Sequence, residues 1–415
     1  MRASTLSIVE GIKTIGVGKR GNRALSAELA LAIFDELKTE DIPEVVKGAF
    51  WGALVIKGIT EEEKILEEIF EAGVFKDSQK LAEAVAPDAP RFVQEICARL
   101  LRQETLDQKT SRQLGNFLFS DSAGDAARGM AASILRVRYE TAQEYAGLLE
   151  SLQETIEGFF CEVPEGDPIV QIAEPFDGVD QSYMVTPLLA RHVQILGYRV
   201  VSLVGRNSGP KFGNNLLDVA EGLQAQFLKR NVDLKCPKPD YGWYIHQKNL
   251  SRGMDRWVEL RLQIIKRPFL ATLERFVNPV RAQMIIASAF HPPYAEKMVT
   301  VGEGAGYSGI IIVRNGLEGT LAFPLLRSVK ILCSVRGRDG SYRRQELEWN
   351  PRQSLGARIE MEEKLTAPAL EKNVQLIKEY TAHGRSGHEP FDWRIKATCE
   401  GIQQAMGWIN EQHVS

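Results

Sequence analysis

The chain has 415 residues, of which 44% are hydrophobic and 25% are charged, and its formal net charge at pH 7 is −3. This composition is close to the average of globular proteins, and the length predicts two or three domains with a large core. Because no run of about 18 apolar residues occurs and the N-terminus lacks the apolar core of a secretory signal, we expect neither a membrane span nor an export signal. The five cysteines are scattered without CxxC spacing, which indicates reduced thiols and a cytoplasmic protein rather than a disulfide framework or zinc site.

The N-terminal part of the chain contains two similar segments. "LSAELALAIFDELKTEDIPEVVKGAFWGALVIKGITEEE" begins at Leu25, and "LDQKTSRQLGNFLFSDSAGDAARGMAASILRVRYETAQE" begins at Leu106, so the two align at one constant offset without a gap. Both predict two helices and then a Thr that caps a third helix, with Glu three positions later. We predict helical units at residues 1–80 and 81–165, with an architectural role and a homodimer formed through them. Coincidence between amphipathic helices is the alternative.

From Asp167 the pattern alternates between strands and helices. The predicted strands are apolar and β-branched, as in a parallel sheet covered on both faces, and lie within residues 168–172, 198–205, 282–290 and 309–316. The predicted crossover helices lie within 215–229 and 294–306, and a hairpin with its turn at Asp339–Gly340 precedes two last helices, near 368–383 and 395–411. The predicted fold class is α/β, with an all-helical N-terminal region and a mainly parallel α/β domain over residues 166–415.

The loop "AEPFDGVDQS", residues 173–182, joins the first predicted strand to a predicted helix. Such junctions bind phosphate in α/β proteins, because backbone N–H groups and the helix dipole converge there. Phosphate loops are usually rich in glycine, whereas this loop has one, Gly178, flanked by Asp177 and Asp180, whose charges repel phosphate. The sequence therefore predicts the position of a sugar-phosphate site without its usual chemistry.

Residues 229–281 are basic in a chain that is acidic overall. Twelve basic and five acidic residues give this segment a net charge of +7, so the remainder of the chain carries −10. Aromatic residues are interleaved with the cations, a composition typical of grooves that bind single-stranded nucleic acid. The nucleic-acid-binding candidates are Lys248, Arg252, Arg256, Trp243 and Tyr244, together with an N-terminal basic cluster of Lys13, Lys19, Arg20 and Arg23. The alternative interpretation is a solvated helix face with salt bridges to the acidic helical units.

The order of these segments resembles anthranilate phosphoribosyltransferase and the wider family-3 glycosyltransferases, which include the pyrimidine nucleoside phosphorylases. The resemblance covers most of residues 20–75 and 100–325. It rests on "IPEVVKGAFWGALVIKGITEEE", "TPLLARHVQILGYRVVSLVG" with "GPKFGNNLLDVAEGL" after it, "RPFLATLERFVNP" and "AFHPPYAEKM". The first and last of these look closest to a divergent branch associated with nucleic-acid binding.

The resemblance implies where functional residues would stand. Active members hold pyrophosphate with a Gly-Thr-Gly-Gly-Asp loop, whose place is taken here by "EPFDGVDQS". The family's magnesium-binding Asp-Glu pair corresponds to Thr320 and Leu321, and Glu318 nearby is a weak substitute, because magnesium needs hard oxygen ligands. The family's Asn is Ala271 here, and its Gly-Pro is replaced by Glu274-Arg275. The remaining ligand- or phosphate-binding candidates, by resemblance or position, are Asp177, Gly178, Thr186, Gly205, Arg206, Asn207, Lys211, His246 and Arg261.

Three hypotheses for function follow. The first is an anthranilate-phosphoribosyltransferase-like protein with a degenerate transferase site, which binds single-stranded DNA or RNA or a phosphorylated small molecule. The second is an active phosphoribosyl or pentosyl transferase on an unidentified acceptor, with Arg206 and Lys211 as a phosphate clamp in place of the metal. The third is a homodimeric scaffold built on the helical units. No catalytic residue is assigned, and no cofactor is expected except magnesium under the second hypothesis.

Overall fold

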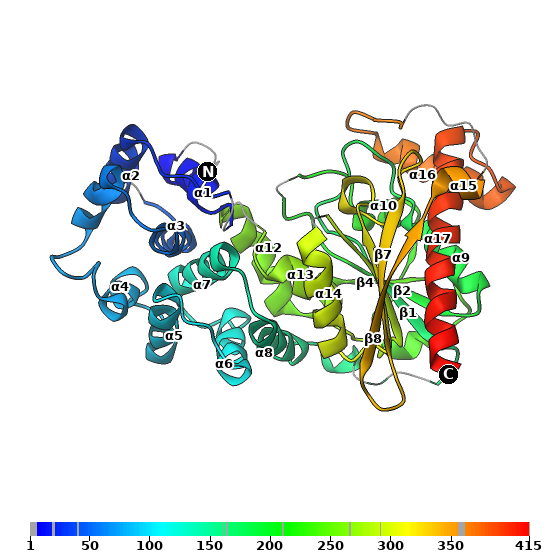
Figure 1. Ribbon diagram of the computed structural model, residues 1–415, viewed down its shortest axis with the longest axis horizontal. Helices are drawn as coiled ribbons and strands as arrows, with labels where there is room; N and C mark the ends of the chain where they lie inside the picture. Colours follow the sequence, from blue (N-terminus) through cyan, green and yellow to red (C-terminus); the bar gives the residue numbers. More distant parts are fainter. Residues whose placement is uncertain are drawn as a thin grey trace. The chain divides into compact units, whose positions relative to one another are not determined.

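The computed structural model describes residues 6–18, 21–39, 41–160, 162, 165–209, 211–264, 267–290, 292–355 and 362–414. The chain divides into two compact units, which Figure 1 shows with the colours of the sequence. One unit comprises Met1–Glu154, Ser208–Pro210 and Arg256–Leu273, and the other comprises Thr155–Asn207, Lys211–Asp255 and Glu274–Ser415. In the part of the chain that is described, no helix is both long and apolar enough to cross a membrane.

The first unit is helical. Its elements are α1 (Ser7–Ile15), α2 (Ala27–Thr39), α3 (Glu44–Lys57), the 3-10 helix η1 (Glu61–Ile69), α4 (Ser78–Val85), α5 (Arg91–Leu101), α6 (Gln108–Leu118), α7 (Asp125–Arg138) and α8 (Ala142–Gln153), with most of α12 (Arg252–Ile264). The predicted continuous α/β region from residue 166 is therefore interrupted. Residues of α12 and beyond join the helical unit because their aromatic side chains are buried there: the Trp257 indole donates to Leu118 O at 3.0 Å, and Phe269 packs on Phe119.

The two helical copies repeat each other with the predicted offset. The first and last residues of α7 correspond to those of α3 under the offset that takes Leu25 to Leu106, and a buried glutamate has the same role in each copy. Glu63 accepts hydrogen bonds from the backbone N–H groups of Leu25 and Thr60, at 2.8 and 2.9 Å, and forms an ion pair with Lys57. Each contact recurs at the equivalent positions of the second copy, with Glu144 bound to Leu106, Thr141 and Arg138.

Two glycines allow α3 and α7 to pack in direct backbone contact. A Cβ atom on Gly48 would lie 1.8 Å from Ala126 O, and one on Gly129 would lie 2.0 Å from Val45 O. The same offset takes Gly48 to Gly129 and Val45 to Ala126, so each contact is the counterpart of the other. The two copies are therefore packed as a pair related by internal symmetry. The predicted all-helical N-terminal region is confirmed, and its two copies repeat each other in structure.

The second unit contains a sheet of eight strands within the described residues, in the order β3-β4-β2-β1-β5-β6-β7-β8. In this order, each strand from β3 across the sheet to β6 pairs in parallel with its neighbour. Strands β7 and β8 pair antiparallel with each other, as the hairpin prediction requires. The strands are β1 (Ile169–Ala173), β2 (Arg199–Val204), β3 (Gln226–Phe227), β4 (Trp243–His246), β5 (Met284–Ala289), β6 (Gly309–Arg314), β7 (Val329–Arg336) and β8 (Tyr342–Trp349).

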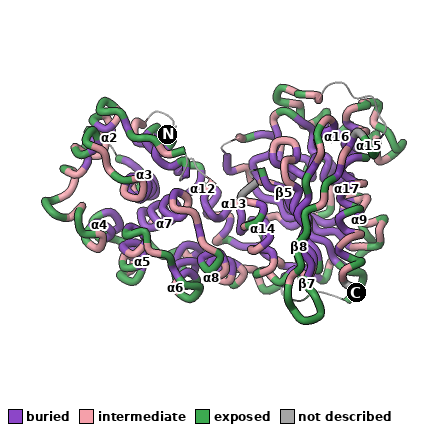
Figure 2. The backbone as a smooth tube through the Cα atoms, in the orientation of Figure 1, coloured by how far each residue is buried: buried purple, intermediate pink, exposed green. Residues whose placement is uncertain are grey.

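Helices cover both faces of this sheet (Figure 1). Helix α14 (Pro292–Gly304) packs on one face, and α9 (Thr186–Ile195) and α17 (Glu389–Val414) pack on the other. Because of this cover, β1, β2 and β5 are buried along their whole length, whereas β8 at the edge is largely exposed (Figure 2). The remaining elements are η2 (Gly158–Phe160), α10 (Leu216–Gly222), η3 (Asn231–Lys235), α11 (Gln247–Leu250), α13 (Leu270–Phe276), η4 (Leu317–Gly319), α15 (Pro351–Leu355) and α16 (Leu370–His383).

The strand order reverses direction at β1. From β1 the chain passes through α9 to β2 on one side, and β5 and β6 later add to the other side. Ligands of open α/β sheets bind at the carboxyl ends of the strands next to such a reversal, because the connecting loops diverge there. The predicted loop at residues 173–182 leaves β1 at this point.

Candidate functional site at the carboxyl ends of the strands

The loop after β1 is fixed by pairing with the loop after β2. Val179 and Asn214 exchange backbone hydrogen bonds of 2.9 and 3.1 Å. Gly178 has a φ of +74°, and a Cβ atom there would lie 2.3 Å from Gly213 O, so this position requires glycine. Asn207 donates to the same Gly213 O at 2.9 Å. Gly178 and Asn207, both predicted ligand-binding residues, therefore shape the loop itself.

The donors of this loop converge on one carboxylate, that of Glu318. The backbone N–H groups of Asp180 and Gln181 donate to it at 3.0 and 2.8 Å, and the Ser182 hydroxyl donates at 2.8 Å. The Lys211 ammonium forms an ion pair with the same group. Burial alone would raise the pKa of Glu318, but the hydrogen bonds outweigh it and the net pKa lies below the ordinary value. The loop thus binds an anion that the chain itself supplies.

A second glutamate, Glu174, is buried directly after β1. Its carboxylate accepts a hydrogen bond of 2.6 Å from the Thr186 hydroxyl and one of 3.1 Å from the Leu321 N–H. The group is fully buried, and this desolvation raises its pKa to about 7, against the opposing effects of these donors and of the Arg275 charge. Arg275 donates to Ser288 O at 2.9 Å at the end of β5. Glu174 at the carboxyl end of β1 and Leu321 after η4 therefore meet at one buried carboxyl group.

The cations predicted as a phosphate clamp are engaged within the second unit. Arg206 forms a two-point contact with Asp255, at 3.1 and 3.0 Å between its guanidinium nitrogens and the two carboxylate oxygens. His246 caps α11 by accepting from Lys248 N at 2.9 Å, and burial lowers its pKa. Gly205 is buried, and a Cβ atom there would lie 2.6 Å from the Phe176 ring.

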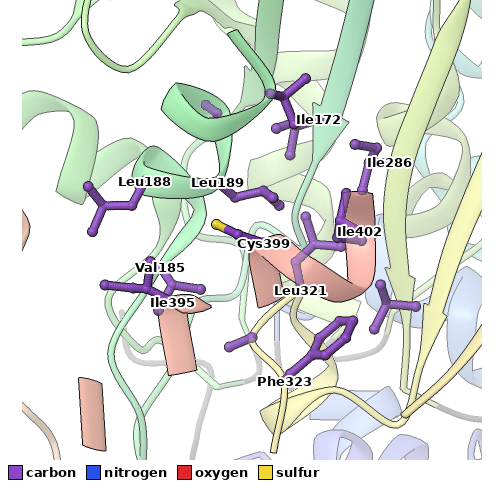
Figure 3. Close-up of a cluster of buried hydrophobic side chains, with 14 of the residues drawn as sticks. Ile172, Val185, Leu188, Leu189, Ile286, Leu321, Phe323, Ile395, Cys399 and Ile402 are labelled. Atoms are coloured by element: carbon purple, nitrogen blue, oxygen red, sulfur yellow. The ribbon is translucent and has the colours of Figure 1, made fainter. Parts of the chain in front are cut away.

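The positions that resemble the metal-binding pair are part of the core. Thr320 is 2% exposed and its hydroxyl donates to Leu317 O at 2.8 Å. Figure 3 shows the Leu321 side chain among apolar side chains of β1, β5, α9 and α17, and it is 0% exposed. Over the described residues, no group of three or more His, Cys, Asp or Glu side chains is placed to hold a metal ion. Asp177 is 6% exposed, and its carbonyl accepts from Gly213 N at 3.1 Å.

The predicted stacking role of Trp243 and Tyr244 is wrong. They are 1% and 0% exposed because they form the interior of β4, a strand that the composition of the segment concealed. Arg256 and Arg261 belong to the helical unit, where Arg256 binds Asp125 at 3.0 Å and Arg261 is 4% exposed. This part of the segment fits the alternative of salt bridges to the helical unit.

Other predicted nucleic-acid contacts are exposed. Lys248 and Arg252 lie on the surface of the second unit, just after β4, and Lys13 and Arg23 lie on the surface of the first. The predicted residues Lys19 and Arg20 fall outside the described residues. The four described cysteines, Cys97, Cys236, Cys333 and Cys399, are free thiols.

Sequence reasoning missed the roles of Glu174, Asp255 and Arg275. Glu174 had a local signal, because it is an acid that directly follows an apolar strand in the expected ligand position. Asp255 and Arg275 had none, since their partners are 49 residues away in the first case and 13 in the second, in other elements.

Distant relatives are similar to this chain in sequence. An uncharacterized protein of Aquifex aeolicus is 22% identical over 321 residues, which are 74% of this chain and 94% of the relative. The anthranilate phosphoribosyltransferase of Geobacillus stearothermophilus is 21% identical over 237 residues, which are 55% of this chain and 66% of the relative. Comparison with models of protein families gives no match.

Solved structures share the fold. Anthranilate phosphoribosyltransferase from Saccharomyces cerevisiae in complex with PRPP and Mg superposes with a TM-score of 0.56 at 14% identity, covering 76% of this chain and 95% of that one. The enzyme from Thermus thermophilus gives 0.50 at 15% identity, covering 75% and 95%.

A helical N-terminal region with a mainly parallel α/β sheet defines the phosphoribosyltransferase type of fold found in these structures. Within that class, the chain has the anthranilate phosphoribosyltransferase fold, and its distant relatives point to that family. The predicted fold class and the resemblance to anthranilate phosphoribosyltransferase are confirmed.

Proposed function

We propose that this chain is an anthranilate-phosphoribosyltransferase-like protein that binds single-stranded nucleic acid and does not carry out magnesium-dependent phosphoribosyl transfer. The observation that carries the proposal is the contact of Glu318 with the loop after β1. The N–H groups of Asp180 and Gln181 and the Lys211 ammonium would be needed by a pyrophosphate, yet they hold a carboxylate. A pyrophosphate and the Glu318 carboxylate cannot use the same donors at once. Phosphoribosyl transfer requires these donors to stabilise the charge of the pyrophosphate, so the occupied loop does not support it.

The surroundings of strand β6 also support the absence of magnesium-dependent transfer from the proposed function. Magnesium in phosphate sites is held by one or two carboxylates and the substrate phosphates. Thr320 and Leu321 carry no carboxylate and are buried, and Glu318 is bound to the loop. The donor set therefore does not fit magnesium, and we derive no step through the metal.

The nucleic-acid half is supported by exposed cations of the second unit. Arg230 and Lys238 are exposed and form ion pairs with Asp233 and Asp167. Lys248 and Arg252 are exposed immediately after β4. A flexible polyanion can follow such surface cations without entering a closed pocket, whereas a small phosphorylated ligand needs convergent donors, and the loop donors are in use. The further exposed cations of this segment in the second unit are Lys229, Lys235 and Arg281.

The test is fluorescence anisotropy with a labelled single-stranded oligonucleotide at several salt concentrations. We expect binding that weakens with salt. The double variant Lys248→Ala/Arg252→Ala should bind more weakly and should reduce the slope of log K against log salt by about 1.4, because each lost phosphate contact on a single strand contributes about 0.7. The matched control is Lys372→Ala/Lys378→Ala, which removes two exposed cations of α16 and should leave the slope unchanged. No anisotropy change with the wild-type chain at low salt would contradict nucleic-acid binding.

The transfer half is tested by calorimetry with phosphoribosyl pyrophosphate, with and without magnesium. We expect no heat that depends on magnesium. A magnesium-dependent binding heat would contradict the proposal and favour an active pentosyltransferase on an unidentified acceptor.

A further inference from the structure

We propose that the loop at residues 180–182 is a complete binding site for a phosphate dianion whose resident occupant is the Glu318 carboxylate, so that Glu318 and phosphate compete for the same donors. The contact is then an autoinhibitory one, closed by the chain itself. This inference rests on the part of the proposed function that concerns the loop, and it is independent of nucleic-acid binding.

The geometry of the donors supports the inference. Gln181 N–H and the Ser182 hydroxyl both donate to Glu318 Oε1 at 2.8 Å, while Asp180 N–H donates to Oε2 at 3.0 Å and Lys211 adds its charge on the same oxygen. Two consecutive backbone N–H groups that point to one centre form an anion-binding concavity. Four donors match the acceptor positions of the two carboxylate oxygens, and the same four would suit the oxygens of a phosphate group.

The backbone around Glu318 indicates that its contact is held against a conformational preference. Glu318 has a φ of +53° within the short helix η4, and Asn315 before it has a φ of +56°. Residues with a Cβ atom disfavour this left-handed region, so the hydrogen bonds of the carboxylate hold the segment in a strained form.

The site is close to solvent. The side chains of Glu318 and Lys211 are 12% and 22% exposed, so the carboxylate lies at the surface end of the loop rather than in the core. Two other carboxylates belong to the loop, those of Asp177 and Asp180, and the positive charge of Lys211 favours a second anion beside them once Glu318 leaves. We therefore expect phosphate to be excluded from the wild-type loop and to bind the loop without Glu318 only while Lys211 is present.

The experiment uses the full chain with Glu318→Ala, and measures thermal and urea unfolding with inorganic phosphate or ribose 5-phosphate, against chloride at the same ionic strength. We expect no specific stabilisation of the wild type and a concentration-dependent stabilisation of the variant. At a phosphate concentration about 100 times the dissociation constant, the folding equilibrium should shift about 100-fold. The two probes separate free phosphate from a phosphate monoester. The double variant Glu318→Ala/Lys211→Ala should lose the response, and Glu371→Ala, an exposed glutamate of α16, should behave as the wild type.

Identical responses of Glu318→Ala and the wild type to both probes would overturn the inference. Should Glu318→Ala not fold, Glu318→Gln replaces it in the experiment, because the glutamine keeps one oxygen acceptor for Gln181 and Ser182 and loses the charge. Phosphate should then stabilise Glu318→Gln more than the wild type. Equal stabilisation of the two would overturn the inference too. If the inference about the loop fails, the results of the nucleic-acid and magnesium experiments keep their meaning for the proposed function. Conversely, a magnesium-dependent heat with the wild type would contradict the proposed function itself.

Discussion

Glu174 offers a direct test of the electrostatics at the carboxyl ends of the strands. Its carboxyl group is fully buried, and desolvation raises its pKa from the ordinary 4.5 to about 7. The perturbation is Glu174→Gln, which removes the charge and the titration. A glutamine oxygen can still accept from the Thr186 hydroxyl and the Leu321 N–H, which both lie within 3.1 Å of one carboxylate oxygen. The variant therefore separates charge from hydrogen bonding.

The sign and size of the effect follow from the two pKa values. The folded chain binds this proton more tightly than the unfolded chain, so the contribution to stability is full below pH 4.5 and is lost as the pH rises through 7. A tenfold difference in proton affinity corresponds to about 1.4 kcal/mol, so the loss between pH 4.5 and pH 8 is about 3 kcal/mol. Glu174→Gln should not show this part of the loss.

The assay is urea unfolding at acid and alkaline ends of this range, for the wild type, Glu174→Gln and the control Glu371→Gln on the exposed side of α16. The wild type and the control should lose about 3 kcal/mol more than Glu174→Gln as the pH rises. Infrared difference spectra should show a protonated carboxyl band that titrates near pH 7 and is missing in the variant. Equal pH dependence of wild type and variant would refute the reasoning.

Two further predictions concern the helical unit. Gly48→Ala should destabilise it by about 3 kcal/mol or more in urea unfolding, because the new Cβ atom would lie 1.8 Å from Ala126 O and α3 and α7 must separate. Glu63→Gln should cost about 3 kcal/mol in the same measurement, because it leaves the buried Lys57 charge without its carboxylate.

Each of these two substitutions has a matched control. Gly407→Ala in α17 places its Cβ atom in open space, and alanine favours a helix, so no loss of stability is expected. Glu62→Gln removes an exposed neighbour of Glu63 and should have little effect. Losses in the controls as large as in the variants would show that glycine contacts and buried pairing are not the causes.

The helical repeat and most strands could be predicted because their signals are local. The capping pairs Thr60–Glu63 and Thr141–Glu144 mark helix starts over a single turn of chain, and both capping boxes are present. The strands β1, β2, β5 and β6 are apolar along their length, as strands covered on both faces must be. Local pattern and tertiary burial agree at these positions.

The net charge of residues 229–281 was a misleading guide to a binding surface, because these residues belong to two different units. "GWYIH" contains the residues that form β4, and Trp243, Tyr244 and Ile245 are buried. An apolar run of this length between polar residues was a strand signal, but the flanking cations dominated the composition. Net charge describes a surface only for residues that reach the surface.

The state of the loop after β1 depends on contacts that no local pattern contains. From the sequence alone, repulsion by Asp177 and Asp180 was the reason to expect that this loop binds phosphate poorly. The structure adds occupation, because Glu318 lies 136 to 138 residues away along the chain and uses the loop donors. Occupation is the stronger effect, because an anion deprived of its N–H donors loses the hydrogen bonds that would replace its hydration. The two acids therefore matter mainly after Glu318 has left the loop.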